Sequence, residues 1–173
     1  LLSLIAGLAL PTDGQVLYRG VPTDEFDLNK YRRENVAVVY QSFNLFPLMT
    51  CLENVCFPLE LLGKNPKEAS VIAKQFIEHV NLPETVGKRF PNMISGGEKQ
   101  RVAIARALAS GAKIILADEP TGNLDVANGE KIVQLLKDLA HVDNYTVIIV
   151  THDMSITQVV DEVMQMSDGY LLP

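Results

Sequence analysis

Two acidic residues end an apolar run in the stretch IILADEP (114–120). A buried strand that carries a carboxylate at its tip can hold Mg²⁺, because this hard cation prefers oxygen ligands and keeps several of its waters. Asp118 is the candidate magnesium ligand, and Glu119 beside it could orient or deprotonate an attacking water. Acidic pairs also follow strands in ordinary solvent-facing turns, so this stretch alone leaves both interpretations open.

The segment SGGEKQR (95–101) predicts the beginning of a helix. Ser95 and Glu98 have the spacing of a capping box. Gly96 and Gly97 each cost roughly 1 kcal/mol relative to alanine in a helix, and a well-capped helix does not need them. They would let backbone amides approach an anion at the positive end of the helix dipole. The segment therefore indicates a phosphate-contacting surface.

Apolar runs of strand length lead into these and other polar residues. The three runs are VAVVY (36–40) before Gln41, KIILA (113–117) before Asp118, and TVIIV (146–150) before Thr151, His152 and Asp153. Because apolar runs alternate with amphipathic helices, we predict an α/β fold with a mostly parallel sheet covered on both faces. Ligands in such folds bind at the carboxyl ends of the strands, where these polar residues should meet.

Residues 41–91 contain no convincing strand and predict a helical insertion. We expect one helix that is interrupted near Pro58 and a second helix that begins at Pro66. The residues expected on the buried face of the second helix are Ile72, Phe76 and Val80. The predicted domains are a first part of the core (1–40), a helical subdomain with the glutamine at its start (41–91), and the rest of the core (92–173).

The remaining segments predict shorter elements around this core. The first residues predict a helix with Leu1, Leu2, Ile5 and Leu8 on one face. Residues 129–140 predict a helix with an apolar inner face of Ile132, Leu135, Leu136 and Leu139. The other expected elements are a strand in 14–20, a helical turn in 29–35, a short helix near 155–160 and a last strand near 162–166.

The composition is typical of a globular protein, and the length is that of one domain. The chain has 173 residues, of which 47% are hydrophobic and 21% charged. Its net charge of −6 offers no basic surface, so nucleic acid is not an expected partner. No apolar stretch reaches the roughly 18 residues of a membrane span, and no secretion signal is expected. Two cysteines, Cys51 and Cys56, are too few for a disulfide framework.

Taken together, the motifs resemble those of the ATP-binding-cassette (ABC) ATPases. The matching stretches are VYQSFN (39–44) for the Q-loop, ISGGEKQR (94–101) for the signature motif, IILADE (114–119) for the Walker B strand, GNLD (122–125) for the D-loop and VTHD (150–153) for the switch histidine. All five occur in the family order, and the resemblance covers essentially the whole chain. The sequence departs from the usual pattern at Ile94, Glu98 and Ala112, where Leu, Gln and Pro are more common. The resemblance implies a P-loop NTPase (RecA-like) core with a helical subdomain.

The resemblance also implies a role for each candidate residue, with ATP and Mg²⁺ as cofactors. Asp118 would bind Mg²⁺, Glu119 would act as general base or position the water, and His152 would link the γ-phosphate to Glu119. Gln41 would contact the Mg²⁺ or the attacking water and report the nucleotide state to the helical insertion. The residues implied to meet a nucleotide held by a second cassette, in a head-to-tail homodimer, are Ser95, Gly96, Gly97, Glu98 and Asp125.

The phosphate loop of this family, G-x-x-x-x-G-K-[ST], does not occur in the sequence. In the family it directly precedes a helix like LLSLIAGL (1–8), and its amides and lysine hold the phosphates. The Gly-Lys pairs at 63–64 and 87–88 are followed by Asn and Arg instead. We therefore expect a core that is incomplete at its N-terminus and a chain that, as given, does not hydrolyse ATP.

The stretches PTGNLD (120–125) and FNLFPLMTCLENVCFPLELLG (43–63) resemble most the ATPases of macrolide, lipoprotein-releasing and antimicrobial-peptide exporters. The resemblance implies an integral membrane permease that docks near Gln41 and the insertion, and a cytoplasmic location, peripheral on the inner face of the cell membrane. The alternatives are an importer ATPase, a degenerate cassette that only dimerises or docks, and a repair or chromosome-organising ATPase. The last is disfavoured because the insertion has neither sustained heptads nor a cysteine cluster.

Overall fold

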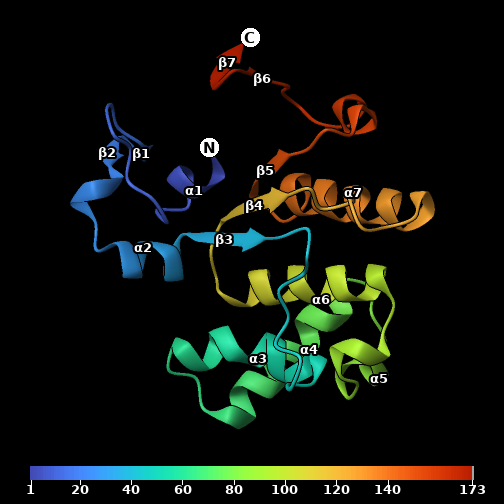
Figure 1. Cartoon of the computed structure of the whole chain (residues 1–173). Helices are drawn as coiled ribbons and strands as arrows, with labels where there is room; N and C mark the ends of the chain where they lie inside the picture. The colour runs from blue at the N-terminus through green and yellow to red at the C-terminus, as the bar shows by residue number, and fades with distance from the viewer. Residues whose placement is uncertain (173) are drawn as a thin grey trace.

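The computed structural model describes residues 1–172, and its centre is a parallel sheet of three strands (Figure 1). These strands are β3 (Val36–Val39), β4 (Ile114–Asp118) and β5 (Thr146–Val150), in the order β3-β4-β5. The register pairs Val39 with Ala117, and Asp118 with Val150, so the three carboxyl ends lie at one edge. The three predicted strands and their parallel arrangement are confirmed.

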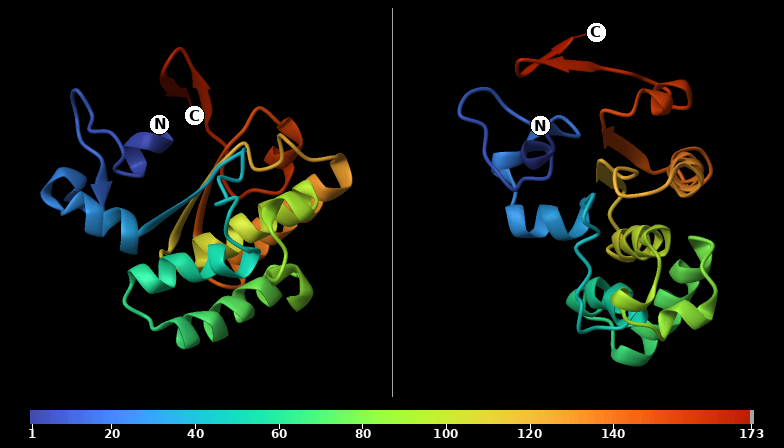
Figure 2. Two further views of the ribbon diagram at one scale, coloured as in Figure 1. Left: turned by 60° about the horizontal axis from the view of Figure 1, so that its bottom comes forward. Right: turned by 45° about the vertical axis from the view of Figure 1, so that its right-hand side comes forward.

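Side chains of alternate strand residues enter two different apolar clusters, as a sheet covered on both faces requires. Val39 and Ile115 belong to the larger cluster, which contains the buried faces of α6 (Gly96–Ala109) and α7 (Val126–His141). Leu116 and Val36 belong to the smaller cluster, with Tyr31 of α2 (Leu28–Glu34). Figure 2 shows α2 on one side of the sheet and α6 and α7 on the other.

The helices that flank the sheet begin at polar caps that follow strands or turns. Ser95 caps α6 with a complete capping box, and Asp125 caps α7 by accepting from the amide of Asn128. The expected inner face of α7 is confirmed, because all four of its members are buried: Ile132, Leu135, Leu136 and Leu139. These caps fix where the signature helix and α7 begin.

Residues 41–91 form helices and no strand, as predicted. The elements are α3 (Cys51–Leu61), α4 (Pro66–His79), α5 (Glu84–Gly87) and the 3₁₀ turn η2 (Pro91–Met93). Helices α3 and α4 pack against each other, and both pack against α6 (Figure 1). Helix α6 therefore joins the helical layer to the sheet.

Two expectations for this layer are wrong. Pro58 does not interrupt α3, which continues to Leu61, because burial of Val55 and Leu59 on either side outweighs the lost hydrogen bond. Val80, directly after α4, is buried as expected, but the buried face of the helix itself is shifted by one residue, to Ala69, Ala73 and Ile77. Ile72 and Phe76 pack only partly buried at its edge, because the two alanines allow close helix approach.

The ends of the described chain carry short elements. Helix α1 (Leu2–Ile5) is shorter than expected: Gly7 takes a left-handed φ of +64°, and Leu8 is exposed. The other elements are the hairpin β1 (Leu17–Tyr18) and β2 (Val21–Pro22), η1 (Thr23–Glu25), η3 (Met154–Gln158), and the hairpin β6 (Gln165–Ser167) and β7 (Tyr170–Leu172). Strand β6 is thus the strand expected near 162–166, but it begins three residues later. It pairs with β7, which the sequence did not predict. Within residues 1–172, no helix has the length and apolar character to cross a membrane.

Candidate functional site

The end of β4 presents Asp118 and Glu119 beside the end of β5. The amide of Glu119 donates to the carbonyl of Val150 at 2.8 Å, which extends the ladder by one bond. Glu119 itself has a left-handed φ of +46°, which is unusual for a residue with a long side chain. This backbone turn brings its carboxylate to Thr151 and His152 at the end of the neighbouring strand.

Three hydrogen bonds converge on the Glu119 carboxylate. The ring nitrogen Nδ1 of His152 lies 2.7 Å from Oε1, and the backbone amide of His152 donates to the same oxygen at 3.1 Å. The Thr151 hydroxyl donates to Oε2 at 3.0 Å. The structure thus places His152 on Glu119, as the resemblance implies, and adds Thr151, which the sequence named only as a polar residue after the strand.

The charges of this pair support each other. Partial burial raises the pKa of Glu119, but the hydrogen bonds from His152 and Thr151 outweigh it and leave that pKa below its ordinary value. The hydrogen bond to Glu119 and its negative charge raise the pKa of His152. The His152 side chain is 83% exposed, so its other ring nitrogen faces solvent. A neutral or cationic imidazole can therefore meet a ligand there while Nδ1 stays on Glu119.

Gln41 lies against the D-loop in this structure. Its backbone carbonyl accepts from the Asn123 side-chain amide at 2.9 Å. Its own side-chain amide lies over Gly122, where an added Cβ would stand 2.6 Å from Nε2. Within residues 1–172 the Gln41 side chain makes no hydrogen bond. It is thus free to bond a ligand that reaches the strand ends.

The donor set at the strand ends suits Mg²⁺ held mainly by a nucleotide and water. Asp118 offers one carboxylate, and Gln41 offers an amide oxygen. No cluster of three or more metal-ligating His, Cys, Asp or Glu side chains occurs among residues 1–172. Mg²⁺ commonly binds through one or two carboxylates together with substrate phosphates and waters, so a single carboxylate is sufficient.

The head of α6 is organised by Ser95 and Glu98. The Ser95 hydroxyl donates to Glu98 Oε2 at 2.8 Å and accepts from the Glu98 amide at 3.3 Å, while the Ser95 amide donates to Glu98 Oε2 at 2.8 Å. The backbone hydrogen bond from Ser95 is the largest cause of a lowered pKa at Glu98. Glu98 is thus committed to the cap, whereas Ser95 remains exposed at the helix N-terminus.

The two signature glycines also lie in close contact with side chains of the same chain. A Cβ at Gly97 would lie 2.9 Å from Asn128 Oδ1, and a Cβ at Gly96 would lie 3.3 Å from Leu124 Cδ2. The sequence interpretation gave only the approach of an anion as their reason. The structure adds a second reason, because the D-loop and the first turn of α7 occupy the space that side chains would need.

Asp125 is exposed, and its carboxylate is bonded within its own helix cap. Its Oδ1 accepts from the Asn128 amide at 3.0 Å and its Oδ2 from the Asn128 side chain at 2.7 Å. The side-chain hydrogen bond from Asn128 is the largest cause of the lowered pKa of Asp125. Asn128 therefore touches both a D-loop residue and Gly97, which sequence motifs did not reveal.

Arg106 and Gln100 on α6 are two further residues that the sequence analysis missed. The Arg106 guanidinium donates to the carbonyls of Asn44 at 2.7 Å and Phe43 at 3.1 Å. Both loop residues have positive φ, so Arg106 holds an otherwise costly turn directly after Gln41. Gln100 is fully buried and neither polar atom of its amide has a partner among the described residues. The sequence did offer one sign of the role of Arg106, because it is the only charged residue in the otherwise apolar run VAIARALAS (102–110).

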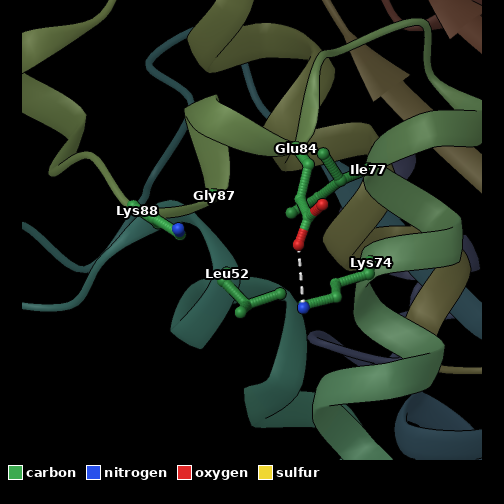
Figure 3. Close-up of a pocket in the computed structure, with 6 residues that line it drawn as sticks. All are labelled: Leu52, Lys74, Ile77, Glu84, Gly87 and Lys88. Atoms are coloured by element: carbon green, nitrogen blue, oxygen red, sulfur yellow. Dashed lines mark ion pairs between the residues drawn. The ribbon is translucent and has the colours of Figure 1, made fainter.

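The hollow shown in Figure 3 lies in the helical layer, away from these residues. It holds about 20 Å³, which is close to the space of a single water. Lys74 and Glu84 form an ion pair of 2.8 Å at its edge. Its lining residues are Leu52, Lys74, Ile77, Glu84, Gly87 and Lys88. None of them belongs to the predicted site, and the space is too small for a nucleotide.

Known proteins are similar to this chain in sequence and in fold. The sequence model described as "ABC transporter" matches residues 1–122. An uncharacterised ABC transporter ATP-binding protein of Mycobacterium tuberculosis is 43% identical over 176 residues, covering 100% of this chain and 71% of the relative. One of Methanocaldococcus jannaschii is also 43% identical, covering 98% of this chain and 74% of the relative.

Solved structures agree with the sequence relatives. A dimeric ATP-binding cassette in a post-hydrolysis state, bound to ADP and Pi, superposes with a TM-score of 0.87 at 41% identity, covering 98% of this chain and 76% of that one. A component of an ABC transporter complex from Clostridium perfringens has a TM-score of 0.88 at 26% identity, covering 99% of this chain and 69% of that one. With a family match over most of its length and relatives of this identity, the chain belongs to the ABC transporter family, as an ATP-binding protein with the α/β fold of its cassettes.

Proposed function

We propose that this chain is the subunit that binds and hydrolyses ATP to power a membrane permease. The observation that carries the proposal is the Glu119–Thr151–His152 cluster at the strand ends, directly after Asp118. Hydrolysis of a nucleotide needs an Mg²⁺ ligand and a group that orients the attacking water. Asp118 and Glu119 supply them from adjacent positions of one strand end.

The geometry favours water positioning over strong base catalysis by Glu119. Its pKa is lowered, so the carboxylate is ionised at neutral pH and is a weak proton acceptor. An ionised carboxylate fixed by three hydrogen bonds can still accept a hydrogen bond from water and hold that water in line. As an imidazolium, which its raised pKa favours, His152 would donate to the γ-phosphate from Nε2 while Nδ1 donates to the ionised Glu119. Bound Mg²⁺ would neutralise charge on the phosphates.

We propose that Ser95 and the first amides of α6 contact a nucleotide held by a second copy of the chain. Ser95 is exposed at a helix N-terminus, where backbone amides and the helix dipole favour an anion. The match to a cassette described as dimeric and bound to ADP and Pi supports this assignment. Asp125, exposed beside the same surface, is the residue proposed to cross the interface.

The absent phosphate-loop consensus predicts weak binding by residues 1–173 alone. We propose that they do not turn over ATP, and a thermal-shift titration with Mg-ATP tests this. Binding to the folded state at a hundredfold excess over Kd would stabilise it by about 2.7 kcal/mol, or roughly 5–11 °C in Tm for a chain of this size. No shift supports the proposal. A shift that disappears in Asp118→Ala would refute the predicted weak binding while supporting the site, and turnover would then be measured directly.

The hydrolytic function is tested in a chimera that places a phosphate-loop segment of the pattern G-x-x-x-x-G-K-[ST] before Leu1. The chimera should hydrolyse ATP, and Glu119→Gln or His152→Ala should reduce kcat by at least about 10². Ser95→Ala should also reduce turnover. Thr50→Ala is its matched control, because Thr50 and Glu53 form the same capping box at α3. Equal loss in both capping variants would show that only helix stability was affected.

Helices α3 to α5, within residues 41–91, are the proposed helical subdomain that receives the permease. The loop after Gln41 exposes Leu48, which is 90% accessible, and Phe46 beside it. A hydrogen bond of 2.8 Å from the Cys51 amide to the Arg89 carbonyl brings this loop to the segment that exposes Phe90. Exposed apolar side chains of this kind mark interaction surfaces. We propose that an apolar permease helix docks here, which would hold the chain at the inner face of the cell membrane.

The docking surface is tested by Leu48→Glu, with Leu61→Glu at the exposed end of α3 as the matched control. Leu48→Glu should prevent co-purification with the cognate permease and leave Tm unchanged. Loss of binding in both variants, or in neither, would argue against this surface. An exporter of a lipoprotein, peptide or macrolide-like compound is the proposed partner, because PTGNLD (120–125) resembles those ATPases.

A module that dimerises or docks without hydrolysis is the second candidate, favoured by the absent phosphate-loop consensus. It predicts that the chimera remains inactive although it folds. An importer ATPase predicts the same turnover as an exporter ATPase, and only the identity of the co-purified permease separates those two.

A further inference from the structure

We propose that Gly122 and Asn123 are positioning residues that hold Gln41 at the strand ends. The inference deepens the proposed function, because it rests on the role of Gln41 at the magnesium site. Neither residue is expected to touch the nucleotide. Both act through Gln41: Asn123 bonds the backbone of Gln41, and Gly122 leaves the space that the Gln41 side chain occupies.

Asn123 fixes the backbone of Gln41. Its Nδ2 donates to the Gln41 carbonyl at 2.9 Å, across 82 positions of sequence. This is the only hydrogen bond between the two loops that involves a side chain of residues 1–172. Since Gln41 lies only two residues after the strand ends at Val39, the bond sets the direction in which the chain leaves the sheet.

Gly122 leaves the space in which the Gln41 side chain lies. An added Cβ would stand 2.6 Å from Nε2, 3.2 Å from Cδ and 3.5 Å from Cγ of Gln41. The closest of these atoms is the far end of a flexible side chain, which can rotate away at little cost. A residue larger than glycine at 122 would therefore move the Gln41 amide while the surrounding backbone keeps its place.

The other side of the loop is anchored independently. Arg106 holds the carbonyls of Phe43 and Asn44, so the residues after Gln41 cannot simply follow a displaced D-loop. Gln41 is thus the point at which two anchors meet, one on α6 and one on the D-loop. Leu124 also packs near Gly96, so the same D-loop segment contacts the head of the signature helix.

The test uses the chain itself, labelled with ¹⁵N, and two-dimensional NMR of side-chain and backbone amides. Gln41→Glu identifies the Gln41 side-chain signals by their loss. Gly122→Ala should shift those signals and, through the displaced Gln41 side chain, the backbone signals of residues 42–44, with Tm equal to or above that of the unchanged chain, because Gly122 has no left-handed φ. Asn123→Ala should shift the backbone signals of residues 41–44 and speed their hydrogen exchange about fivefold. Asn92→Ala, at an exposed asparagine whose side chain makes no hydrogen bond in residues 1–172, should change neither.

A Gln41→Ala background separates positioning from a general effect on structure. There, Gly122→Ala should no longer perturb the signals of residues 42–44, because the side chain through which it acts is gone. Gln41 signals that are unchanged in both Gly122→Ala and Asn123→Ala would overturn the inference. So would a Gly122→Ala perturbation that persists in the Gln41→Ala background. No nucleotide enters these measurements, so failure of the chain to bind Mg-ATP would count against the proposed function and not against this inference.

Discussion

Replacing Gly97 by alanine inserts a methyl group where α6 meets the first turn of α7. The added Cβ would lie 2.9 Å from Oδ1, 3.0 Å from Cγ and 3.2 Å from Cβ of Asn128. Asn128 cannot retreat freely, because its side chain donates to Asp125 at 2.7 Å. The clash must therefore either break that bond or separate the two helices.

Opposing effects set the size of the change. Alanine gains up to about 1 kcal/mol over glycine from helix propensity. Overpacking a filled contact costs about 1–3 kcal/mol, and loss of the Asn128 bond to Asp125 acts in the same direction and offsets the gain from helix propensity. The balance predicts that Gly97→Ala lowers the free energy of unfolding by about 1–3 kcal/mol, or the Tm by roughly 2–12 °C.

Gly129→Ala is the matched control for a urea-denaturation measurement. Gly129 is also buried in a first helical turn, but its added Cβ would meet only Thr121, at an ordinary 3.6 Å. It should therefore raise the free energy of unfolding by up to about 1 kcal/mol. In an Asn128→Ala background, Gly97→Ala should cost about 1 kcal/mol less, because its two closest contacts are removed.

The result that would refute this reasoning is a Gly97→Ala variant as stable as the unchanged chain while Gly129→Ala is stabilised. Packing against Asn128 would then place no demand on Gly97. The approach of a nucleotide to the α6 amides would remain as the reason for this glycine.

Three further predictions concern the same region. The ion pair between His152 and Glu119 stabilises the fold only while both groups are charged. On the alkaline side, its contribution is fully present below pH 6.5, the ordinary histidine pKa, and is lost as pH rises through the raised pKa of His152. On the acid side, it is lost as pH falls through the lowered pKa of Glu119. Unfolding free energies of the unchanged chain and His152→Ala should thus differ most between pH 4.5 and 6.5, and a constant difference from pH 4 to 9 would contradict the pairing. Arg106→Lys should lose about 1.5–3 kcal/mol in urea denaturation, because an ammonium cannot span two loop carbonyls, and an unchanged midpoint would argue against that anchor. Gln100→Met should raise stability by about 1 kcal/mol in the same assay, since it removes an unpartnered buried amide; a loss would indicate that the amide is satisfied after all.

The sequence was sufficient for the elements whose pattern is local. Apolar runs bounded by polar residues predicted β3, β4 and β5 to within one residue, because a strand buried on both faces needs consecutive apolar side chains. Ser95 followed by Glu98 predicted the head of α6, since a capping box depends on only four residues. The pairing of Glu119 with His152 was expected from the family resemblance, whereas the strand pattern alone predicted only that both lie at the carboxyl ends of parallel strands.

The tertiary structure decided what depends on contacts between distant segments. The buried face of α4 turned toward Ala69 and Ala73, because approach to α3 rewards small side chains more than it rewards the largest apolar ones. Pro58 stayed within α3 because the burial of its neighbours outweighs one hydrogen bond. Neither effect is visible in a single helix, since both depend on the facing helix.

The same distinction holds within the candidate site. The residue types and their order along the chain determined which side chains could bind Mg²⁺, orient water and meet a phosphate. Only the folded chain brought Asn123 to Gln41, Asn128 to Gly97 and Arg106 to the loop after Gln41. These contacts join residues from about 30 to more than 80 positions apart, and packing of α6 against the D-loop, α7 and the end of β3 creates them. Sequence spacing can predict a motif, but the contacts between motifs form only when the chain folds.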